Sequence, residues 1–181
     1  MKKLLTAISL AIAATFAVAN PIGFINYDYG SNSSKALQEV TIGGSTQGPW
    51  GIWDLGVLYQ SLDSNGSATG LELGFNKGVK VGAVTLKGRL GLGYVDGETN
   101  GDGFYSASAE AELPLTQRVG AYANYRYRNT FSSDLSWRSN RAAIGLDFLI
   151  APRTGLRVGY VSTEQNDVRY NGATVTLAHQ F

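Results

Sequence analysis

The feature that most constrains this chain is a strict alternation of apolar and polar residues, clearest in VTLKGRLGLGY at residues 84–94. Even positions include Leu86 and Leu90, whereas odd positions include Lys87 and Arg89. A period of two is that of a β-strand, whose successive side chains point to opposite faces. Two cations opposite a row of leucines fit either a soluble sandwich with its charges in water or a membrane barrel with its charges inside.

The N-terminus favours the membrane barrel. MKKLLTAISLAIAATFAVAN has two lysines, an uncharged apolar run at residues 4–18 and a closing A-V-A triplet. This order is typical of a secretory signal peptide, and the run is short for a membrane span of about 20 residues. We therefore predict a signal peptide at residues 1–19 and one barrel domain at residues 20–181.

The alternation recurs in ten segments separated by clusters of Gly, Asn, Asp and Ser. None of the outward positions that we assign to these segments carries a fixed charge; on the fourth segment they are Leu71, Leu73 and Phe75. A lysine or arginine facing lipid at the midplane costs about 2–4 kcal/mol, so this is what a lipid-facing wall requires. We predict an all-β, transmembrane, antiparallel up-and-down barrel of ten strands, or of eight if residues 31–49 form one long loop.

Aromatic residues mark both ends of the apolar band. If the first strand rises from the periplasm, one set of tyrosines falls at the external rim: Tyr29, Tyr59, Tyr94, Tyr105, Tyr127 and Tyr160. A second set of rings falls at the periplasmic rim: Trp53, Phe75, Phe148 and Phe181. Such girdles at the headgroup level are typical of outer-membrane barrels.

The inward positions carry opposed walls of unlike charge near the external half of the lumen. Arginines lie on the seventh and eighth segments, and carboxylates, including Glu39, lie on the first, second and fourth. Opposed walls create a transverse field that orients polar solutes in a constriction. The residues that we predict to contact solute are Arg126, Arg128, Arg141, Asp28 and Glu72.

A second group of inward charges predicts structural salt bridges between neighbouring strands. Cations on one segment face carboxylates on the next, which is a stabilising cross-strand arrangement. The pairs are Lys87 and Arg89 with Glu110 and Glu112, and Asp147 with Arg157.

Composition excludes several other functions. The chain has no cysteine, one histidine and a formal net charge of +1. There is no basic excess for nucleic acid, no ligand cluster for a metal, and no sign of a cofactor. Because the single histidine, His179, falls on the lipid side, a serine–histidine mechanism is unsupported and we predict no enzyme activity.

The last segment, ATVTLAHQF, ends in an aromatic residue with apolar residues at alternate places. Together with the signal peptide and the amphipathic segments, it resembles the outer-membrane β-barrel proteins of Gram-negative bacteria. The resemblance implies an outer-membrane location, the lipid bilayer as environment, and Phe181 as the signal that the barrel assembly machinery recognises. The arginine-bearing wall faintly resembles that of small porins for acidic oligosaccharides.

The size of the barrel limits its function. Ten strands spaced about 4.8 Å apart and tilted about 40° give a backbone radius of about 10 Å, which leaves a narrow channel at most. We predict a small passive channel for polar or anionic solutes, or alternatively a plugged barrel with a structural role in the envelope. A strip of outward alanines is a candidate homo-oligomer seam, or simply a thin part of the lipid face: Ala107, Ala109, Ala111, Ala121 and Ala123.

Overall fold

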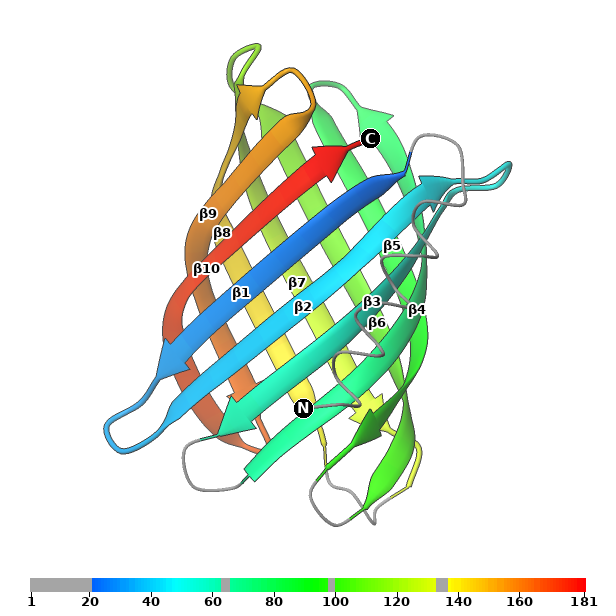
Figure 1. Ribbon diagram of the computed structural model, residues 1–181. Helices are drawn as coiled ribbons and strands as arrows, with labels where there is room; N and C mark the ends of the chain where they lie inside the picture. Colours follow the sequence, from blue (N-terminus) through cyan, green and yellow to red (C-terminus); the bar gives the residue numbers. More distant parts are fainter. Residues whose placement is uncertain (1–20, 63–65, 98–99, 133–136) are drawn as a thin grey trace.

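The computed structural model is a closed barrel of ten antiparallel strands (Figure 1). It describes residues 21–62, 66–97, 100–132 and 137–181, so the expected signal peptide at 1–19 lies outside the described residues. The strands are β1 (Ile22–Ser31), β2 (Ala36–Gln47), β3 (Ile52–Leu62), β4 (Gly66–Val81), β5 (Val84–Asp96), β6 (Gly101–Pro114), β7 (Val119–Thr130), β8 (Ser139–Ala151), β9 (Thr154–Gln165) and β10 (Val168–Gln180).

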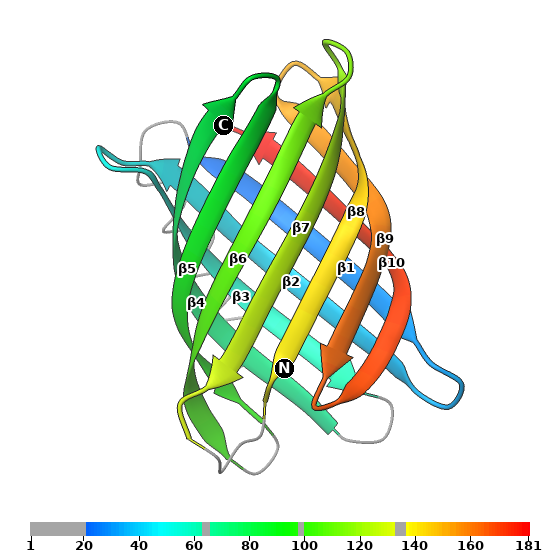
Figure 2. The ribbon, with the colours of Figure 1, turned by 180° about the vertical axis from the view of Figure 1, so that it is seen from behind.

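Each strand pairs with its neighbours in sequence, and β1 pairs with β10 to close the cylinder. Figures 1 and 2 show β1 beginning and β10 ending at the same rim, which we call the periplasmic rim. The prediction of a ten-strand up-and-down transmembrane barrel is confirmed. The eight-strand alternative is wrong, because β2 occupies most of the segment that would have had to be a loop. Within the described residues, no helix is long and apolar enough to cross a membrane.

Short turns set the register of two hairpins. Gly82 has a φ of +62° in the two-residue turn between β4 and β5, a conformation that glycine adopts without steric cost. Asn166 and Asp167 have φ values of 50° and 66° in the turn between β9 and β10. Consecutive left-handed residues of this kind match the twist of a two-residue hairpin, and Asn and Asp tolerate them better than other side chains.

Strand β4 is longer than the sequence pattern predicted. It continues past Phe75 to Val81 and pairs with β5 along this whole length. The extension brings Lys77 onto the outward face, opposite Gly88 of β5. The expectation of an outward face without charge therefore holds only as far as Phe75 on this strand.

The distribution of exposure is the reverse of that in a soluble protein. On β5, Leu90 and Leu92 are 68% and 62% exposed, whereas the side chain of Arg89, next to Leu90, is 18% exposed. Five of the six tyrosines expected at the external rim are exposed too, among them Tyr94 and Tyr160, whereas Tyr127 is half-buried. The leucines thus form the outer wall and the charged residue points into the lumen.

Two clusters of buried apolar residues lie inside the barrel, the larger of them in its external half. Leu58, Val95 and Phe104 pack together there with Trp137, which enters from the segment between β7 and β8. A smaller cluster of Tyr122, Ala143 and Val161 lies on β7, β8 and β9. The side chains that would form the core of a soluble domain therefore fill part of the lumen.

Candidate functional site

The candidate site is the lumen, where the arginine wall and the carboxylate wall are in contact. Arg128 of β7 donates from Nη1 to Glu39 Oε1 of β2 at 3.0 Å and from Nη2 to Glu72 Oε2 of β4 at 2.7 Å. These three side chains are 3–5% exposed. The sequence pattern predicts two separate walls on opposite sides of the lumen. Arg128 spans the lumen and joins them.

Arg141 and Asp28 form a second contact across the lumen. Arg141 donates from Nε to Asp28 Oδ2 at 2.5 Å and from Nη2 to Asp28 Oδ1 at 2.9 Å. This two-point geometry is the strong form of an arginine–carboxylate pair. Thr174 Oγ1 and Asn124 Oδ1 accept the remaining bonds from Arg141 at 3.1 and 3.2 Å.

Arg126 shares Glu39 with Arg128. Its Nη1 lies 3.0 Å from Glu39 Oε1 and its Nη2 lies 3.2 Å from Oε2. The Arg126 side chain is 13% exposed, against 4% for Arg128. Arg126 is therefore the less deeply buried of the two predicted solute-contacting arginines on β7.

Arg89 has partners other than those that the sequence suggested. It donates from Nη2 to Asp54 Oδ1 at 2.6 Å and also pairs with Glu72. The register explains the difference, because β5 and β6 place Arg89 opposite Ser108 rather than a carboxylate. Gly74 makes room for this reach, since a Cβ there would overlap the Arg89 guanidinium.

We call the resulting set of four cations and four carboxylates the external network. Its members are joined by the ion pairs above: Arg89, Arg126, Arg128, Arg141, Asp28, Glu39, Asp54 and Glu72.

The other predicted salt-bridge residues form a separate periplasmic network of Lys87, Arg157, Glu110, Glu112 and Asp147. Lys87 Nζ lies 2.6 Å from Glu112 Oε1. Arg157 is the hub, with contacts of 2.7 Å to Glu110, 2.9 Å to Glu112 and 2.6 Å to Asp147. These side chains are 16–37% exposed, so this network is much more open to water than the external one.

An aromatic layer of Trp137 and Phe104 lies against Arg128 of the external network. Trp137 is 4% exposed, and its Nε1 donates to Gln60 Oε1 at 2.7 Å. The Trp137 ring packs edge-on against Phe104 at 4.9 Å, and the Arg128 guanidinium lies 5.6 Å from its centroid. Gln60 Nε2 also donates to Gln165 Oε1 at 3.3 Å.

Sequence reasoning missed Trp137, Gln60 and Gln165 as lumen residues. Trp137 ends the mostly polar segment NTFSSDLSW, which has no alternation that would assign a residue to the lumen. The available signal was the large ring itself, because a tryptophan in an otherwise polar segment tends to find a buried position with a partner for its N–H.

The lumen holds a cavity of about 460 Å³ that is lined by members of both networks. It extends from Ile22 and Ile52 at the periplasmic rim up to Leu58 and Arg128. Among the described residues, the buried polar atoms without a hydrogen-bond partner include Thr41 Oγ1, Tyr122 Oη and the Nε atoms of Arg126 and Arg128. All four residues line this cavity, although these four atoms are themselves buried.

Metal binding has no support in this arrangement. Within the part of the chain that the structure describes, no group of three or more His, Cys, Asp or Glu residues is arranged to hold a metal ion. The carboxylates of the periplasmic network converge on Arg157 instead.

Comparisons with known proteins identify the fold. No protein-family model matches the chain, and no curated protein matches it in sequence. Among solved structures, the NanC porin is similar with a TM-score of 0.54 and 8% identity, covering 88% of this chain and 100% of the porin. The β-domain of the Bordetella autotransporter BrkA is similar with a TM-score of 0.57 and 13% identity, covering 90% of this chain and 98% of that domain. The chain therefore has the fold of outer-membrane β-barrels.

Proposed function

We propose that this protein is an outer-membrane barrel of a Gram-negative bacterium whose lumen is closed toward the outside, so that it serves the envelope as a non-conducting structural barrel. The observation that carries the proposal is the position of Arg128, held between Glu39 and Glu72 beneath Trp137. A solute passing through would have to displace the tryptophan and separate these ion pairs.

The energetics support a closed resting state. Breaking a buried ion pair leaves an uncompensated buried charge and costs about 3–5 kcal/mol. The passage would require this at Arg128, which has two carboxylate partners, and at Arg141, which spans the lumen to Asp28. Thermal motion alone would open such a path rarely.

The same proposal includes export and assembly. The signal peptide at residues 1–19 would direct the chain across the inner membrane, and the barrel assembly machinery would recognise the final strand with Phe181. Phe181 N donates to Pro21 O at 3.0 Å, next to the seam between β1 and β10. The aromatic terminus therefore lies at the strand pair that closes the barrel.

The proposal includes no catalytic activity. The chain has one histidine, and His179 lies exposed at the periplasmic end of β10, where its Nδ1 is 2.9 Å from Thr154 Oγ1. A histidine there has no contact with the lumen side chains that would bind a substrate.

A second candidate function is a narrow passive channel for polar or anionic solutes. The observation that favours it is the cavity of about 460 Å³, which reaches from the periplasmic rim to Arg128. In this case a solute would contact the residues predicted from the sequence once Trp137 moved aside: Arg126, Arg128, Arg141, Asp28 and Glu72.

Single-channel recording in planar bilayers tests the two candidates. We expect no conductance steps from the wild-type barrel and discrete steps from the double variant Trp137→Ala/Arg128→Ala, with circular dichroism confirming that the variant is folded. Trp50→Ala is the matched control, because Trp50 is 76% exposed in the periplasmic turn between β2 and β3. Steps from the wild type, with an anion preference that Arg126→Ala lowers, would overturn the closed barrel in favour of the channel.

A further inference from the structure

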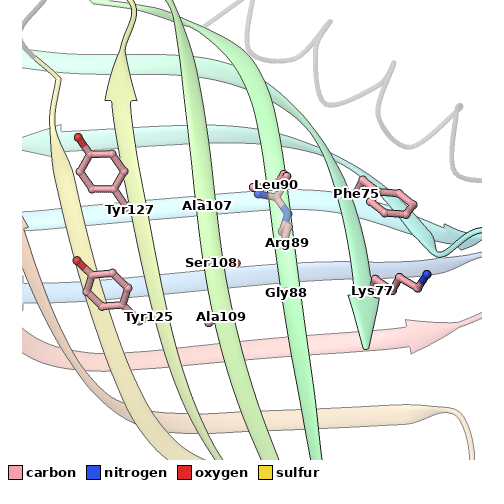
Figure 3. Close-up of a pocket in the computed structure, with 10 residues that line it drawn as sticks. All are labelled: Phe75, Lys77, Gly88, Arg89, Leu90, Ala107, Ser108, Ala109, Tyr125 and Tyr127. Atoms are coloured by element: carbon pink, nitrogen blue, oxygen red, sulfur yellow. The ribbon is translucent and has the colours of Figure 1, made fainter. Parts of the chain in front are cut away.

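The outward wall has a hollow of about 500 Å³ over β4 to β7. Figure 3 shows Phe75 and Lys77 on one side of it and Tyr125 and Tyr127 on the other. Its floor consists of small residues, Gly88, Ala107 and Ala109, and a Cβ added to Gly88 would meet no atom within 4 Å. This is an apolar depression in a surface that faces lipid chains.

Lys77 is the unusual residue of this hollow. Charged residues at other outward positions of the ten strands lie near the external ends: Asp96, Glu164 and Arg169. Glu164 and Arg169 pair with each other at 3.3 Å. Lys77 is exposed and has no ion pair with any residue that the structure describes. An unpaired cation in a lipid-facing wall needs a counter-charge from outside the barrel.

The depth of Lys77 identifies where that counter-charge lies. Lys77 is six residues along β4 from Leu71, which pairs with Tyr94 of the external girdle. Six residues correspond to about 15 Å along the barrel axis at a tilt near 40°, in an apolar band about 25 Å tall. The long lysine stem can carry its ammonium further toward the periplasmic headgroups.

We propose that this hollow binds an anionic glycerophospholipid of the periplasmic leaflet. An acyl chain lies over Gly88, Ala107 and Ala109, and the Lys77 ammonium pairs with the lipid phosphate. The apolar floor suits a hydrocarbon chain, and the phosphate supplies the negative charge that the protein surface lacks at this depth.

Charge also argues against a second copy of the chain as occupant. A two-fold interface places the same patch of each copy against the other, which would bring the two Lys77 side chains together without a carboxylate. The alanine strip predicted as an oligomer seam shares Ala107 and Ala109 with the hollow. In this proposal, those alanines accommodate lipid.

Native mass spectrometry of the full barrel, released from vesicles of phosphatidylglycerol and phosphatidylethanolamine, tests the proposal. We expect the wild type to retain phosphatidylglycerol in preference to phosphatidylethanolamine. Lys77→Gln should lower the retention of phosphatidylglycerol about fivefold. Gly88→Leu should lower it as well, because the leucine fills the open space over the floor. Lys80→Gln is the matched control, since Lys80 lies three residues further along the same strand on the opposite face.

Three outcomes would overturn the proposal. The first is that Gly88→Leu retains as much phosphatidylglycerol as the wild type does. The second is equal retention of the zwitterionic lipid, which would remove the anionic preference. The third is a lipid-free dimer that Gly88→Leu dissociates, which would make the hollow an interface between copies.

Discussion

In the external half of the lumen, the Arg128 side chain is 4% exposed between two carboxylates, whereas in the periplasmic half the Lys87 side chain is 37% exposed beside Glu112. Both halves are lined with ion pairs, yet Arg128 packs against the rings of Trp137 and Phe104, whereas Lys87 is partly exposed. The difference teaches that inward charge alone does not distinguish a pore from a plug.

The physical reason lies in what surrounds each pair. Buried charges must be fully paired, so removing one partner there is costly, whereas partly exposed charges can turn to water instead. The external network has four cations for four carboxylates, beneath Trp137. The periplasmic network has two cations for three carboxylates, and its side chains are partly exposed.

The largest effect should come from Glu72→Ala. Glu72 pairs with Arg128 and Arg89 and accepts a hydrogen bond from Ser106 Oγ at 2.6 Å. Its loss leaves two arginines underpaired, and we expect the free energy of unfolding to fall by about 3–5 kcal/mol. Urea unfolding in lipid vesicles, followed by tryptophan fluorescence, measures this. Glu112→Ala in the periplasmic network is the control, and an equal loss there would contradict the contrast between the halves.

A smaller effect is expected from Gln60→Leu, which keeps the volume of the side chain but removes the acceptor for Trp137 Nε1. A buried donor left without a partner costs about 1–3 kcal/mol. The same urea titration measures the loss, and fluorescence should also report a more mobile Trp137. Gln38→Leu, the same change at an exposed outward position of β2, should cost nothing comparable; similar losses at both sites would refute a special role for the aromatic layer.

The smallest effect is expected from Lys87→Ala. Because this side chain is more than a third exposed, its pairs with Glu110 and Glu112 are screened by water, and we expect a loss of about 0.2–1 kcal/mol. Added salt should reduce the difference from wild type further. Urea titrations at low and high salt test this, and a salt-independent loss as large as that of Glu72→Ala would mean that the periplasmic half is as tightly held as the external one.

The fold could be predicted in detail because the pleat has a period of exactly two residues. That period assigned Leu90 to the outer wall and Arg89 to the lumen before any tertiary structure was considered. The prediction of an uncharged outward face failed in β4 beyond Phe75, where apolar and polar residues no longer alternate. Lys77 lies there on the same outward face as Leu73 and Phe75.

The arrangement of the site was less predictable. The strand β6 beside β5 suggested Glu110 as a partner for Arg89, but Arg89 turns to the other side, toward Glu72 of β4 and Asp54 of β3. Trp137 lies outside the strands, so no alternation could assign it to the lumen. Both errors concern contacts between residues distant in sequence.

By itself, the sequence determined which face of the wall each strand residue occupies, because local backbone geometry alternates side chains whatever the surroundings. Only the tertiary structure decided which charges meet. Arg128 reaches Glu39 across 89 positions of sequence and Glu72 across 56, because closing ten strands into a narrow cylinder brings opposite walls within the length of one arginine and one glutamate side chain.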